Sequence, residues 1–153
     1  MKQQKVDHGA WIALCDGARS LILSNFGDDN FFHFRTVEAK EGNRRPSQEI
    51  GRDKPPRVQE SVGSHRISIA TNDKHDEEEK RLIREFADRL HIAVTGGMTE
   101  TIVLVAPPLA LGYLRKVISD PVRRAVRFEF RKDFLKLSID ELEVQLKKLL
   151  LEQ

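Results

Sequence analysis

The stretch Thr101-Ile-Val-Leu-Val-Ala-Pro-Pro108 decides the fold of this 153-residue chain. Residues 102–106 are all apolar and show no polar alternation, which predicts a central strand covered on both faces. Such a strand belongs to a sheet that carries helices on its two sides. Because proline is favoured in the first turn of a helix, Pro107-Pro108 predicts that a helix follows the strand directly.

Upstream of this strand, three short segments predict an antiparallel meander. Residues 10–15 form an apolar run that Asp16-Gly17 closes, and this pair is typical of a tight turn. Residues 20–26 resume the apolar pattern and end at a cluster of glycine, aspartate and asparagine over 27–30. Residues 31–37 are rich in aromatic and β-branched side chains, which favours a third strand.

Helical spacing is clearest around Leu82. From that residue, apolar side chains recur at i, i+1, i+4, i+5 and i+8, which places them on one face of a helix. Asn72 or Asp73 would cap this helix, and the four acids at 76–79 would complement its dipole. Gly96-Gly97 would end it.

The last third of the chain predicts a helix, a strand and a final helix. Residues 109–118 carry apolar side chains on one side, and Ser119-Asp120-Pro121 stops this helix. Residues 126–131 alternate apolar and charged side chains, as a half-exposed strand does. Ser138-Ile-Asp-Glu141 is a capping box that opens the last helix.

The predicted fold class is therefore α/β, with a single mixed sheet in the order β-β-β-(long loop)-α-β-α-β-α. This order is that of the ribonuclease-H-like class. The length fits one domain, residues 1–153, and 39% hydrophobic residues suffice for a core. A formal charge of +2 excludes a polycation, so any basic surface must be local.

The predicted long loop, residues 43–72, breaks the regular pattern. It holds three prolines, two glycines and no aromatic residue, and only residues 64–70 alternate enough to allow a short strand. Between residues 43 and 66, six basic side chains outnumber three acidic ones, which leaves a net charge of +3.

The basic side chains of this loop are the candidate nucleic-acid-binding residues: Arg44, Arg45, Arg52, Lys54, Arg57 and Arg66. Arginines among glycine and proline suit contacts with phosphates. Without aromatic residues, the loop offers no stacking platform for bases, so contact would be with the backbone of the nucleic acid. The alternative, which composition alone favours, is a solvated, mobile loop without a partner.

The sequence offers little for catalysis. A ribonuclease-H-type nuclease needs carboxylates around two Mg²⁺ ions, one of them in the first strand, and residues 10–15 carry none. Asp16 fits a turn better than a metal site. His65 and His75 match no metal-ligand spacing, so neither a metal nor another cofactor is expected. Cys15 lies in an apolar run, where burial would make the thiol inert.

A second basic set surrounds the second predicted helix and the last strand. Its members are Arg115, Lys116, Arg123, Arg124, Arg127, Arg131 and Lys132. Acidic residues lie between them, and we interpret this set as an ordinary charged surface.

The sequence predicts a cytoplasmic protein without a membrane contact. No apolar stretch follows the lysines near the N-terminus, as a secretory signal would require. The longest apolar runs are far shorter than a membrane span. A lone cysteine allows no intramolecular disulfide, which fits a reducing compartment.

Several motifs resemble those of the bacterial host attachment protein family, proteins required for attachment to host cells. The most specific are Asp16-Gly-Ala-Arg19 and Val105-Ala-Pro-Pro108, and the resemblance covers nearly the whole chain. It marks seven positions without giving their roles: Asp16, Gly17, Arg19, Gly51, His75, Pro107 and Pro108.

That family is in turn similar to the middle domain of the class-1 translation release factors of eukaryotes and archaea, whose element order agrees with the predicted one. In those factors the long loop carries Gly-Gly-Gln, which promotes peptidyl-tRNA hydrolysis, and this sequence has no Gly-Gly-Gln. The resemblance implies a non-catalytic, release-factor-like protein that binds RNA, with the ribosome or tRNA as partner in translation. The alternative is a bacterial factor required indirectly for attachment to host cells, and a peptidyl-tRNA hydrolase is the least expected function.

Overall fold

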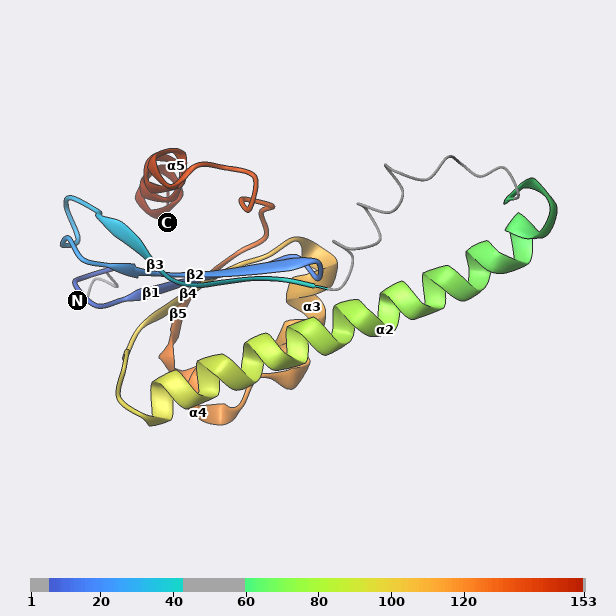
Figure 1. Cartoon of the computed structure of the whole chain (residues 1–153). Coiled ribbons are helices and arrows are strands. Elements are labelled where there is room, and N and C mark those ends of the chain that lie inside the picture. The colour runs from blue at the N-terminus through green and yellow to red at the C-terminus, as the bar shows by residue number, and fades with distance from the viewer. Residues whose placement is uncertain (1–5, 43–59, 153) are drawn as a thin grey trace.

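One mixed sheet with helices on both faces forms the protein (Figure 1). The computed structural model describes residues 6–42 and 60–152, and for residues 60–75 only the course of the backbone. The strands are β1 (Trp11–Cys15), β2 (Arg19–Asn25), β3 (Phe34–Glu41), β4 (Ile102–Val105) and β5 (Val126–Phe130). The described helices are α2 (Glu60–Thr95), α3 (Pro108–Val117), α4 (Asp120–Ala125) and α5 (Ile139–Leu151).

The five strands lie in the order β3-β2-β1-β4-β5. The first three are antiparallel neighbours, so the predicted meander is confirmed. β4 is parallel to β1 on one side and to β5 on the other. The predicted α/β class with a single mixed sheet is therefore confirmed, and the ribonuclease-H-like order remains a prediction that this sheet fits.

β1 is buried on both faces because each face of the sheet carries its own layer of helices. Trp11, Ala13 and Cys15 pack with α2, α3 and α4. The intervening Ile12 and Leu14 pack toward α5 on the other face (Figure 1). β4 alternates in the same way, which explains why Ile102–Val105 has no polar residue.

The predicted start of the first helix is wrong. α2 has 36 residues and begins at Glu60, so residues 60–72 are helix, and the short strand over 64–70 does not form. No proline interrupts the chain between Pro56 and Pro107, and a single glycine inside a helix costs only about 1 kcal/mol, so the helix extends beyond its amphipathic part. The remainder of the predicted loop, residues 43–59, lies outside the described residues.

The apolar face predicted around Leu82 is confirmed, since Ile83, Phe86 and Leu90 lie in the core beneath α2. The interpretation of the acids at 76–79 is wrong. They lie four to five turns inside the helix, where they cannot complement the dipole of its first turn.

The other boundaries follow the predictions with two differences. Ser138 and Glu141 form the predicted capping box at the start of α5. Ser119 ends α3 as expected, but it also precedes a further short helix, α4, in which Pro121 occupies the first turn. β3 begins at Phe34 rather than at residue 31, because residues 26–33 form a loop. None of the described helices is both long and apolar enough to span a membrane.

Candidate functional site

A crevice opens at the carboxyl ends of β1 and β4, which are parallel neighbours. After β1 the chain turns toward β2, and after β4 it turns the other way, through α3 toward β5. Ligands of α/β proteins bind at such a point, where adjacent parallel strands continue in opposite directions. We call this hollow, of about 390 Å³, the carboxyl-end crevice.

Three elements line the carboxyl-end crevice. The turn after β1 contributes Asp16 and Gly17, and α3 with its preceding residue contributes the opposite wall. α2 contributes the remaining side of the crevice. The lining residues are Asp16, Gly17, Asp76, Glu79, Lys80, Ile83, Pro107, Leu109, Ala110 and Tyr113.

The turn after β1 is held by the carboxylate of Asp16. Its Oδ1 accepts hydrogen bonds of 2.9 Å from the backbone N–H groups of Ala18 and Arg19. Gly17 has a φ of +89°, which disfavours any other residue type. A β-carbon there would lie 3.3 Å from the side chain of Glu79, so the glycine also lets α2 pack closely against the turn.

On one side of the crevice, charged groups on α2 lie close to the ring of Tyr113 on α3. The Nζ of Lys80 lies 3.4 Å from Asp76 and 5.8 Å from the centre of the Tyr113 ring. Arg84 donates a 2.9 Å hydrogen bond to the Tyr113 hydroxyl. The aliphatic rim is formed by Leu109, whose side chain is 91% exposed.

Cys15 is buried at the end of β1, and Asp16 is engaged by the turn that follows it. Burial raises the pKa of the Cys15 thiol to about 12, so the thiolate is scarce at neutral pH. The Oδ1 of Asp16 is engaged by two backbone donors. Within residues 6–42 and 76–152, no three His, Cys, Asp or Glu side chains converge in a geometry that could hold a metal ion.

The structure brings together three of the positions marked by the resemblance: Asp16, Gly17 and Pro107 all line the crevice. Arg19 and Pro108 are the first residues of β2 and α3 and adjoin it. For His75 the structure describes only the backbone, one residue before Asp76. Gly51 lies outside the described residues.

The candidate nucleic-acid-binding residues are not placed. Arg44, Arg45, Arg52, Lys54 and Arg57 lie outside the described residues, and for Arg66 only the helical backbone of α2 is described. In the second basic set, several members have internal partners. Arg115 pairs with Glu129 at 2.6 Å, and Arg123 donates to two backbone carbonyls at the end of α3.

Sequence reasoning missed the α2 side of the crevice. Asp76, Glu79, Lys80 and Ile83 follow the i, i+3, i+4, i+7 spacing of one helix face, and this spacing was the available signal. The four acids at 76–79 also fit a helix start, and that interpretation hides the spacing.

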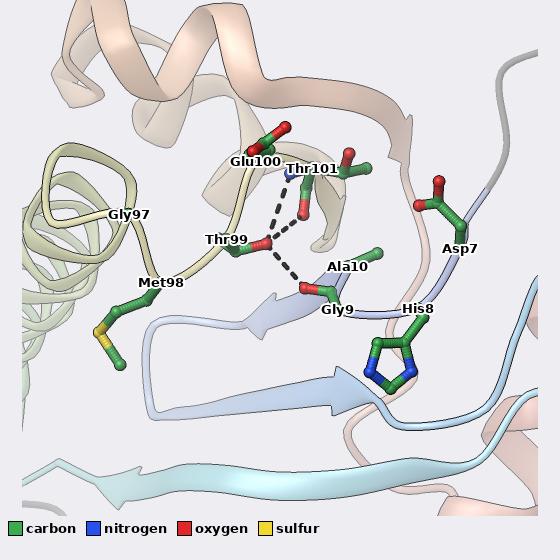
Figure 2. A pocket seen from close by; sticks show the side chains of 9 residues that line it. All are labelled: Asp7, His8, Gly9, Ala10, Gly97, Met98, Thr99, Glu100 and Thr101. Carbon is green, nitrogen blue, oxygen red and sulfur yellow. Dashed lines mark hydrogen bonds between the residues drawn. The ribbon is translucent and has the colours of Figure 1, made fainter.

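A second hollow, of about 310 Å³, lies at the opposite end of the same two strands (Figure 2). At its base the buried Thr99 places its hydroxyl 2.9 Å from the carbonyl of Gly9 and 3.0 Å from that of Thr101. These contacts join the chain entering β1 to the chain entering β4. His8 and Asp7 extend from the β1 side of this hollow (Figure 2).

The fold and the crevice define a mixed α/β domain with a candidate ligand site at the switch point of its sheet. Residues 11–146 match the family described as "Protein required for attachment to host cells". The chain belongs to this family, as the motifs around Asp16 and Pro107 predicted. None of the curated proteins compared matches the sequence. The similarity to release-factor middle domains stays a prediction.

Proposed function

We propose that this member of the attachment family acts as an RNA-binding protein without hydrolytic activity, with the ribosome or tRNA as its partner. The observation that carries the proposal is where the basic segment, residues 43–59, leaves the sheet. The backbone N–H of Gly42, the last residue before it, donates a 2.7 Å hydrogen bond to Ala18, in the turn after β1. Gly42 therefore lies beside the turn that lines the carboxyl-end crevice, and the basic segment follows it in the sequence.

The charge of the segment supports a polyanionic partner. Five basic residues (Arg44, Arg45, Arg52, Lys54 and Arg57) and two acidic ones (Glu49 and Asp53) give it a net charge of +3. The whole chain carries only +2, so the remainder is close to neutral. Clustered arginines contact phosphates without reading base sequence, and each such contact releases a counterion.

The chemistry at the crevice supports binding rather than catalysis. At the end of β1, burial raises the pKa of the Cys15 thiol to about 12, and the Oδ1 of Asp16 accepts two backbone hydrogen bonds. The sequence also lacks the Gly-Gly-Gln motif that promotes peptidyl-tRNA hydrolysis in release factors. We expect no release of peptide from peptidyl-tRNA.

Ribosome cosedimentation at low and high salt tests the proposal. We expect salt-sensitive binding that falls at least about tenfold when Arg44, Arg45, Arg52 and Arg57 are changed to alanine. The matched control changes Lys116, Arg124, Arg131 and Lys132 to alanine, which removes the same charge from exposed positions elsewhere. Equal binding by wild type and segment variant, or an equal loss in the control, would contradict a role for the segment.

The same two variants connect RNA binding to attachment. In a strain that lacks this protein, we expect the control variant to restore attachment to host cells and the segment variant to fail. Full restoration by the segment variant would separate attachment from RNA binding.

A further inference from the structure

The loop joining β2 to β3 lies at one end of the sheet (Figure 1), opposite the carboxyl-end crevice. It carries two exposed phenylalanine side chains. Phe31 is 78% exposed and Phe26 is 51% exposed. Phenylalanine is normally among the buried residues, and exposed apolar surface that is gathered in one place is a candidate interaction site. We call Phe26, Phe31, His8, His33 and Arg35 the aromatic platform.

A buried side chain holds this loop in shape. Asn25 is 0% exposed, and its Nδ2 donates to the carbonyls of Val6 and Asp28, each at 3.1 Å. Its Oδ1 accepts hydrogen bonds of 3.0 Å from the backbone N–H groups of Gly27 and His33. Both ends of the loop are thus tied to one point in the interior.

The tip of the loop is fixed as well. Asp28 Oδ1 accepts hydrogen bonds from the backbone N–H groups of Asn30 and Phe31, at 2.9 and 2.7 Å. Lys147 of α5 donates to the carbonyls of Asp29 and Asn30. The Phe31 ring is therefore presented on an ordered backbone, so binding through it costs little additional ordering.

Cationic and imidazole groups surround Phe26. The guanidinium of Arg35 lies 4.7 Å from the centre of the Phe26 ring, and the His8 ring meets it edge-on at 6.3 Å. The Nε of Arg35 donates to His33 Nε2 at 3.4 Å. His8 is also one of the residues that line the second hollow (Figure 2).

We propose that the aromatic platform stacks unpaired bases of single-stranded RNA, with Phe31 as the principal ring. Aromatic side chains and arginine planes are the surfaces on which proteins stack unpaired bases. This inference rests on the proposed function, because the basic segment supplies phosphate contacts but has no aromatic residue. Arg35 adds a cation beside the Phe26 ring, and the Oδ1 of Asp28 accepts hydrogen bonds from its own loop backbone.

Fluorescence anisotropy with two probes tests the stacking. One probe is a single-stranded RNA of ten uridines, and the other is an abasic strand with the same sugar-phosphate backbone. We expect wild type to bind the RNA more tightly than the abasic strand, and Phe31→Ala to lose roughly 5- to 100-fold in affinity for the RNA alone. Phe31→Trp, which keeps a stacking ring, is expected to retain binding.

The matched control is Leu151→Ala, which removes an apolar side chain that is also 78% exposed, at the end of α5. Equal binding of both probes by wild type, or an unchanged RNA affinity in Phe31→Ala, would overturn the stacking while leaving the proposed function intact. The segment variant separates the two, because its loss is expected with both probes. Binding of neither probe by wild type would remove both proposals.

Discussion

At each end of β2 a polar side chain holds a turn. The surfaces beside the two turns differ in chemical character. Asp16 caps the turn after β1, and beside it the charges of the carboxyl-end crevice are paired, as in Lys80 with Asp76. Asn25 organises the loop at the other end, where Phe26 and Phe31 face solvent. The crevice turn is therefore built into the packing of α2, whereas the aromatic platform adds nothing to the core and is available for a partner.

The largest expected effect comes from Asn25→Ala. The substitution leaves two backbone N–H groups and two carbonyls around Asn25 without this partner. We expect the free energy of unfolding to fall by about 3–5 kcal/mol, as measured by urea denaturation. Asn30→Ala, an exposed change in the same loop, should stay within about 0.5 kcal/mol. A similar small loss for Asn25→Ala would show that the loop does not depend on its buried anchor.

We expect the free energy of unfolding to depend on pH through the thiol of Cys15, at the end of β1 beside the crevice. Its pKa is raised to about 12 in the folded protein from an ordinary value of 9.0, so the unfolded state releases the proton first as pH rises. Stability from the neutral thiol is complete below pH 9 and is lost toward pH 12, by about 1.4 kcal/mol per pH unit.

The measurement compares urea unfolding of wild type and Cys15→Ala from pH 8 to pH 11. Because other groups titrate in both proteins, the prediction concerns the difference between their free energies of unfolding. Across this range, wild type should lose about 2–3 kcal/mol of stability relative to Cys15→Ala. A constant difference would indicate that the thiol is accessible to water.

A comparison of alanine substitutions at two glycines separates the cost of backbone strain from the cost of a new steric contact. Gly17→Ala and Gly9→Ala both force alanine to a positive φ, of +89° and +87°. A new β-carbon meets Glu79 only at Gly17, whereas Gly9 has nothing within 4 Å. We expect losses in stability of about 2 kcal/mol at Gly17 and about 1 kcal/mol at Gly9, by urea denaturation. Equal losses would contradict close packing between α2 and the turn.

The smallest expected effect on stability belongs to Phe31→Ala. Because the ring is 78% exposed, its removal should change the free energy of unfolding by less than about 0.5 kcal/mol. Thermal and urea unfolding check this directly. A loss above about 2 kcal/mol would show that the ring belongs to the core and would weaken its assignment to a binding surface.

The elements that carry a clear local sequence pattern could be predicted from the sequence. The apolar run of β4 required cover on both faces, and the capping box at Ser138 fixed the start of α5. The length of α2 could not be predicted in this way, because residues 60–72 show no amphipathic period and only the absence of a breaker lets the helix continue.

The candidate site was predicted in part. Asp16, Gly17 and Pro107 were marked by motifs, and they meet because β1 and β4 are adjacent and parallel. Tyr113 and Lys80 join them through helix packing, which no local pattern encodes. The platform was missed because residues 31–37 were assigned to a strand, whereas Asn25 draws the backbone of residues 27 and 33 into a loop that exposes Phe31.

The central claim is that the basic segment supplies phosphate contacts and the aromatic platform supplies stacking. The salt dependence of affinity for the ten-uridine RNA tests this claim most directly. The account predicts that the segment variant lowers the slope of log affinity against log salt by about 3, from four lost phosphate contacts. It predicts that Phe31→Ala lowers the affinity at every salt concentration and leaves the slope unchanged. A slope that is the same in wild type and segment variant would contradict the account.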